Sequence, residues 1–186
     1  MTGLNPEVDC LVEIAVVITD SELNILDEGI DIVVKPTAEG LASMNEFVTN
    51  MHTESGLINE FDSGVSLEDA TAMVLDYVKR FVPEAKSSPL CGNTIGTDRM
   101  FIARYMPELD QYLHYRNIDV SSIKELSRRW YPRVYFNMPM KAGGHRALAD
   151  IKESIKELQY YRKTVFVEVP GPTSDDAKAA ADSLGE

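Results

Sequence analysis

A β-branched and mostly apolar run near the start of the chain, residues 11–18, constrains the fold more than any other feature of the sequence. Such a run predicts a buried strand. Residues 21–24 have the composition of a turn, and residues 28–35 form a second run with strand character. The two runs together predict a β-hairpin.

The rest of the chain alternates between helical and strand patterns. Residues 39–61 predict short helices, and capping boxes at residues 66–69 and 122–125 predict two longer ones. Short strands are expected at residues 89–93 and 117–120, a helix broken near Pro107 at 98–113, a loop at 132–144 and an amphipathic helix at 148–158. This order predicts an α/β fold with a mixed central sheet flanked by helices. A sheet of this kind normally has a strand leading into the hairpin, so a first strand is expected to be missing.

Composition favours one ordinary globular domain. The chain has 186 residues, of which 44% are hydrophobic and 26% charged. No apolar run approaches the roughly 20 residues that a membrane span needs, and Cys10 and Cys91 are too few for a disulfide framework. We therefore expect a cytoplasmic protein with no membrane association. The net charge of −12 disfavours binding of long nucleic acids. It is compatible with a substrate that has few phosphates if divalent cations bridge the protein's carboxylates to those phosphates.

Two short stretches could carry chemistry. Asp98 lies just after a predicted strand end, where open α/β sheets build sites. His145 and Asp150 lie about 140° apart on an ideal helix, and they converge if His145 sits at a flexible helix start that Gly143 and Gly144 allow. For each stretch taken alone, a surface histidine or an aspartate that stabilises the helix dipole is the better explanation.

Four aromatic and basic positions are also candidates. Arg116 could hold a phosphate, and Tyr115 could stack on a ring or donate a proton, although a packed surface cluster around His114 is the default. Phe47 and His52, in a region of predicted helix, are more often core and surface residues than base-stacking ones.

Six strings that occur in order along the chain raise these candidates above their alternatives. They are MTGL at 1–4, LVEIA at 11–15, GN at 92–93 with Asp98, YMPEL at 105–109, HYR at 114–116 with DVS at 119–121, and HRAL at 145–148 with DI at 150–151. The set resembles the oligoribonucleases, members of the DEDD exonuclease superfamily with a ribonuclease H-like fold. The sequence from Arg128 to Pro172 is most similar to that of actinobacterial members of the family. The resemblance implies an exonuclease domain at residues 1–166, truncated at its N-terminus, and an acidic, loosely packed tail at 167–186.

The resemblance implies a 3′-to-5′ exoribonuclease that degrades very short oligoribonucleotides to nucleoside 5′-monophosphates. Members of the family bind two divalent cations, Mg²⁺ or Mn²⁺, through four acidic residues, of which Asp98 matches the third and Asp150 the fourth. His145 matches the general base that activates the attacking water. Tyr115 matches a tyrosine that reaches the active site from the partner subunit of a homodimer.

The resemblance also implies a binding site for the substrate. Leu4 matches a residue that wedges against a terminal base, and Phe47 and His52 match a stacking position and its neighbour, although Phe47 replaces the tryptophan expected there. The residues that match those capping the 5′ phosphate are Thr94, Arg116 and Ser121. Such a closed end would restrict the substrate to a few nucleotides.

One motif of the family is incomplete here. The first motif reads Asp-x-Glu-x-Thr-Gly, and residues 1–3 supply only its end. We expect the two missing acids to lie immediately before Met1, which is then an internal methionine taken as the start; a real truncation is the alternative. Two other functions stay open: an inactive homologue that retains only ligand binding or dimerisation, and a DNA-directed exonuclease of the same superfamily.

This departure generates a prediction for the chain of 186 residues. We expect negligible release of mononucleotides from a pentaribonucleotide in saturating Mg²⁺ or Mn²⁺, because two-metal cleavage needs ligands shared between the ions. Adding a short upstream segment that contains Asp-x-Glu should restore the activity. Equal activity of the two chains would show that another acid, with Glu13 the first suspect, does this work.

Overall fold

A computed structural model describes residues 1–140 and 143–185. The elements, in chain order, are β1 (Glu13–Val16), β2 (Ile30–Val33), α1 (Ala38–Ser43), α2 (Glu46–Glu54), the 3₁₀ helix η1 (Leu57–Ser63), α3 (Leu67–Phe81), β3 (Leu90–Gly92), α4 (Ile95–Tyr105), α5 (Pro107–Tyr112), β4 (Asn117–Asp119), α6 (Val120–Trp130), α7 (Pro132–Phe136), α8 (Ala147–Thr164) and α9 (Ser174–Ser183). Strands and helices are interleaved, so the predicted α/β class is confirmed. Among the described residues no helix is long and apolar enough to cross a membrane.

The predicted hairpin is formed by β1 and β2, which pair antiparallel with Ile14 opposite Ile32. Both of these side chains are buried in the main hydrophobic cluster. Because side chains alternate along a strand, Glu13 lies on the other face of β1 from Ile14. The hairpin thus has one apolar face and carries a carboxylate on the opposite one.

A second pair of strands, β3 and β4, is parallel, with Gly92 opposite Asp119. Helices α4 and α5 connect the two strands, as a parallel pair requires. Within residues 1–140 and 143–185 the two pairs share no strand ladder, so the expected mixed sheet consists of one antiparallel and one parallel pair.

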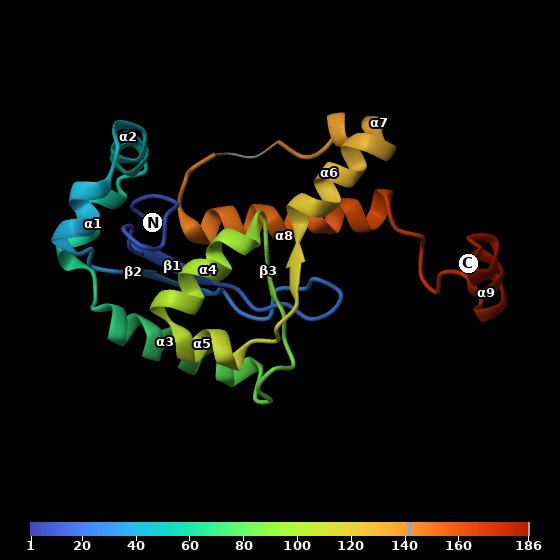
Figure 1. Cartoon of the computed structure of the whole chain (residues 1–186), viewed down its shortest axis with the longest axis horizontal. Coiled ribbons are helices and arrows are strands. Elements are labelled where there is room, and N and C mark those ends of the chain that lie inside the picture. Colours follow the sequence, from blue (N-terminus) through green and yellow to red (C-terminus); the bar gives the residue numbers. More distant parts are fainter. Residues whose placement is uncertain (141–142, 186) are drawn as a thin grey trace.

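Helix α8 unites the two strand pairs. It contacts β1, β2 and β3, and in Figure 1 it lies beside the hairpin and crosses the second pair. Helix α3 packs on β2, while α4 packs on β3 and β4. The main cluster joins the hairpin to these helices through buried residues such as Val74 of α3 and Phe101 of α4.

Two local features differ from the sequence-based prediction. Helix α6 begins at Val120 rather than after Ser122, because Asp119 is its N-cap and accepts a hydrogen bond from the Ser121 backbone N–H. The expected loop after residue 132 contains α7, which has Pro132 in its first turn, where a missing N–H costs nothing. The tail, expected to be loosely packed or partly helical, contains α9, none of whose described residues is buried. The domain boundary at residue 166 stays a prediction.

Candidate active site

Asp98 lies in the first turn of α4, directly beyond the end of β3. The chain enters this helix through Thr94, whose φ of 54° lies in the left-handed region. Burial raises the pKa of the Asp98 carboxyl group, and a backbone hydrogen bond and the Met1 amino group act against that rise. The sequence therefore placed Asp98 correctly at a strand end, and the fold makes it a partly desolvated carboxylate.

The start of α8 presents His145 and Asp150. Gly143 and His145 have φ angles of 69° and 49°. His145 is exposed just before the helix, and Asp150 is exposed in its first turn. The glycine-rich helix start that the sequence indicated therefore exists, with His145 in a conformation that a residue with a side chain seldom adopts.

Glu13 is the residue near this site that the sequence did not explain. Its carboxylate accepts hydrogen bonds from Arg146 Nε at 2.7 Å and from the Ala147 backbone N at 2.9 Å. Arg146 also pairs with Glu60, with Nη1 2.7 Å from Oε1. The sequence does show an acid inside an apolar strand. Because a buried carboxylate requires a partner, this position indicated a polar contact. Since Glu13 is engaged with Arg146, it is not a free substitute for a missing metal ligand.

The described residues do not form a complete metal centre. Asp98 and Asp150 offer the carboxylate oxygens that Mg²⁺ and Mn²⁺ prefer. Among residues 1–140 and 143–185, however, no group of three or more histidine, cysteine, aspartate or glutamate side chains could hold an ion. The residues present therefore fit part of the expected ligand set only.

Thr94 and Ser121 are brought together at the carboxyl ends of β3 and β4. Their hydroxyl oxygens lie 3.2 Å apart, and the Thr94 backbone N donates to both Asp119 Oδ1 and Ser121 Oγ at 3.0 Å. A shallow pocket of about 410 Å³ is lined by Thr94, Asp119, Ser121, Ser122, Glu125 and Leu126. Hydroxyl groups and an open pocket of this kind can receive a polar substrate group.

The segment before β4 is exposed. The rings of His114 and Tyr115 stack with centroids 4.5 Å apart, and the Arg116 guanidinium lies 5.4 Å from the centroid of the Tyr115 ring. Tyr115 is 75% exposed. This segment could therefore contact a substrate or a second subunit without rearrangement of the core.

The candidate base-stacking residues divide into two exposed side chains and one buried ring. Leu4 is 74% and Phe47 75% exposed, whereas His52 is only 3% exposed. His52 Nε2 lies 3.0 Å from the Met1 carbonyl oxygen, and its ring packs edge-on against Phe61. His52 therefore lies inside the protein and supports the N-terminal segment.

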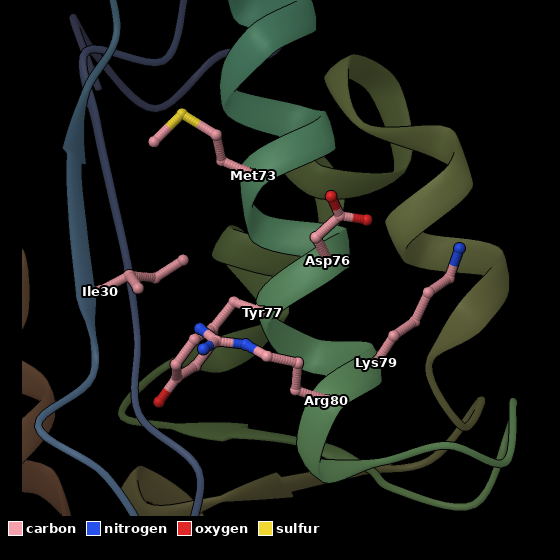
Figure 2. A pocket seen from close by; sticks show the side chains of 6 residues that line it. All are labelled: Ile30, Met73, Asp76, Tyr77, Lys79 and Arg80. Atoms are coloured by element: carbon pink, nitrogen blue, oxygen red, sulfur yellow. The ribbon is translucent and has the colours of Figure 1, made fainter.

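A further pocket, of about 710 Å³, lies between β2 and α3. It is lined by Ile30, Met73, Asp76, Tyr77, Lys79 and Arg80. Figure 2 shows Met73 reaching toward the strand that carries Ile30, with Asp76 and Lys79 turned away. None of the predicted site residues lines this pocket, so it is separate from the candidate active site.

A family model and individual relatives both show similarity to exonucleases. A family model described as Exonuclease (RNase_T) matches residues 1–158. The chain is 64% identical to an oligoribonuclease of Leifsonia xyli over 186 residues, covering all of this chain and 90% of the relative. It is 60% identical to an oligoribonuclease of Streptomyces coelicolor, covering 97% and 90%, and 59% identical to one of Rhodococcus jostii, covering 100% and 94%.

The buried state of His52 generates a prediction about stability. Burial lowers the pKa of this imidazole below its ordinary 6.5, against the opposing effect of the Met1 carbonyl. Between these two pKa values the unfolded chain binds a proton that the folded chain does not, so the free energy of unfolding should fall as the pH drops below about 6.5. Urea unfolding at pH 8 and pH 5.5 should show a smaller difference for His52→Asn than for the unchanged chain. An equal difference would contradict the assignment.

Proposed function

Because this chain belongs to the oligoribonucleases, a family of exonucleases, we propose that the residues around His145 and Asp98 form its catalytic site. The family makes the protein a hydrolytic 3′-to-5′ exoribonuclease that degrades short oligonucleotides, with a ribonuclease H-like α/β fold. The observation that carries this conclusion is identity of 64% along the whole chain. An inactive homologue or a DNA-directed exonuclease is not favoured.

Divalent metal ions are required by this family of exonucleases. We propose that the ions are Mg²⁺ or Mn²⁺, that two are used, and that Asp98 and Asp150 supply two of the ligands. Their carboxylate oxygens are the donor type that these hard cations prefer. The described residues supply only part of the ligand set.

His145 is the proposed general base. Histidine is the side chain best suited to accept a proton near neutral pH. The exposed position of His145, just before α8, leaves its ring accessible to a water molecule beside a bound phosphodiester. The protein thereby supplies a proton acceptor at one edge of the site.

The substrate is proposed to bind between two ends. At one end the paired hydroxyls of Thr94 and Ser121, together with the exposed Arg116, cap the 5′ phosphate. At the other end Leu4 and Phe47 present apolar surface to a terminal base, and His52 supports this surface from below. A closed phosphate end favours products and substrates of few nucleotides, and the net charge of −12 suits a substrate with few phosphates.

We further propose that the protein is a cytoplasmic homodimer that acts on short RNA. Tyr115 is a candidate for reaching the active site of the second subunit because its ring is exposed and stacks only on its neighbour His114 and under Arg116 among the contacts of the described residues. Exposed aromatic rings are enriched at protein interfaces.

The base assignment is tested by His145→Ala. Turnover of a pentaribonucleotide should fall by about 10²- to 10⁴-fold, because general acid–base catalysis contributes that much. The measurement is made in the chain that carries the upstream Asp-x-Glu segment. Folding should be unaffected, since the ring is exposed. Unchanged turnover would remove His145 from the mechanism.

The assembly proposal is tested by Tyr115→Ala. Activity should fall strongly, while the free energy of unfolding changes by no more than about 0.5 kcal/mol, as is usual for an exposed position. Phe136→Ala is the matched control, because Phe136 is a similarly exposed aromatic residue on α7. A fully active monomer in sedimentation equilibrium would contradict the shared site.

A further inference from the structure

The start of α8 is fixed by an acid from another element. Arg146, the N-cap residue of α8, provides no side-chain cap for the helix. Glu13 of β1 takes that place, with Oε2 2.9 Å from the Ala147 backbone N and Oε1 2.7 Å from Arg146 Nε. A carboxylate at a helix N-terminus is favoured by the unpaired N–H groups and by the helix dipole. One buried side chain therefore holds two successive residues.

Arg146 extends this contact to a third element. Its Nη1 lies 2.7 Å and its Nη2 3.4 Å from the two oxygens of Glu60 in η1. The Glu13 side chain is 6% exposed and that of Glu60 44%, so the two acids are not equivalent. The pairing with Glu13 is shielded from water, and the pairing with Glu60 is partly screened. We call Glu13, Arg146 and Glu60 the clamp.

The clamp acts on the backbone of His145. This residue, directly before Arg146, has a φ of 49°, a conformation that costs a residue with a side chain free energy. Such conformations persist where the surrounding structure determines them. On the N-terminal side Gly143, with a φ of 69°, offers freedom rather than restraint. The restraint on His145 therefore comes from the residues that follow it.

We propose that Glu13 is a positioning residue for His145, acting through Arg146 and the first N–H of α8. The inference rests on the proposed role of His145 as general base. A proton acceptor displaced by about 1 Å can lose about 100-fold in rate, so a base beside a flexible glycine segment needs an anchor. The clamp also accounts for a carboxylate within an apolar strand, where an aliphatic side chain would give the more stable sheet.

The charge around the clamp is consistent with this role. Asp31 of β2 has its carboxyl pKa raised, first by burial and then by the charge of Glu13, while Arg146 acts to lower it. Arg146 thus stands among three carboxyl groups. Its fork can bind two acids at once, which the single ammonium group of a lysine cannot reproduce.

The first test uses nuclear magnetic resonance on the chain of 186 residues. Glu13→Gln preserves size but turns an NH₂ group toward one of the two donors. We expect amide hydrogen exchange at Ala147 to accelerate at least about tenfold and the backbone shifts of His145 to move toward flexible-chain values. Glu60→Gln should produce a smaller change, and Arg146→Lys an intermediate one.

The matched control is Glu22→Gln. Glu22 pairs with Arg162 near the other end of α8, so its loss removes an ion pair between the same hairpin and the same helix. Exchange at Ala147 and the shifts of His145 should not change. Equal responses to Glu13→Gln and Glu22→Gln, or no response to Glu13→Gln, would overturn the proposal.

The second test separates positioning from general stabilisation. Turnover is measured for the unchanged chain, Glu13→Gln, His145→Ala and the double variant, all with the upstream Asp-x-Glu segment. Glu13→Gln should lower kcat at least about tenfold with little change in KM, but should cost nothing further when His145 is absent. If the reductions in kcat of the two single variants multiply in the double variant, Glu13 acts independently of His145. Full activity of His145→Ala would instead refute the proposed base, whereas the exchange result at Ala147 would still report on the clamp.

Discussion

The buried pairing of Glu13 with Arg146 is the interaction on which the arrangement of this protein depends. A carboxylate removed from water is costly unless a cation and hydrogen bonds replace the water. Arg146 and the Ala147 N–H provide both at 2.7 and 2.9 Å. Because these two residues start α8, the folding of the hairpin and the placement of the helix are coupled.

Helix α8 carries this constraint to the rest of the fold. Farther along it, Ser154 and Glu157 accept hydrogen bonds from the Asn93 side chain at 2.9 and 3.2 Å. Asn93 directly precedes Thr94. The same helix therefore holds the end of β3 in the place where the Thr94 and Ser121 hydroxyls are in contact. The proposed base and the proposed phosphate end are therefore positioned by the first turn and the middle of one helix. The metal ligands are less complete, since Asp98 and Asp150 gather no third ligand among the described residues.

The sequence predicted those features that local patterns determine. The hairpin followed from two β-branched runs, and local patterns placed Asp98 after a strand end and His145 at a glycine-rich helix start, whereas the roles of Asp98, His145 and Asp150 rest on the family resemblance and stay predictions. Helix α7 was missed because its five residues are too short to show periodicity. The clamp was missed because Arg146 lies 133 positions from Glu13 and 86 from Glu60, and no local pattern encodes a contact between such distant residues. His52 has no pattern that distinguishes a buried ring from an exposed one.

The coupling between Glu13 and Arg146 tests this account most directly. A double-mutant cycle of Glu13→Gln and Arg146→Met, followed by urea unfolding, gives the interaction energy of the pair. The account predicts a coupling of at least about 1 kcal/mol, with the double variant losing less stability than the sum of the two single losses, because each single variant leaves a buried polar group without its partner. A coupling near zero would contradict it and would reduce the pair to a surface contact.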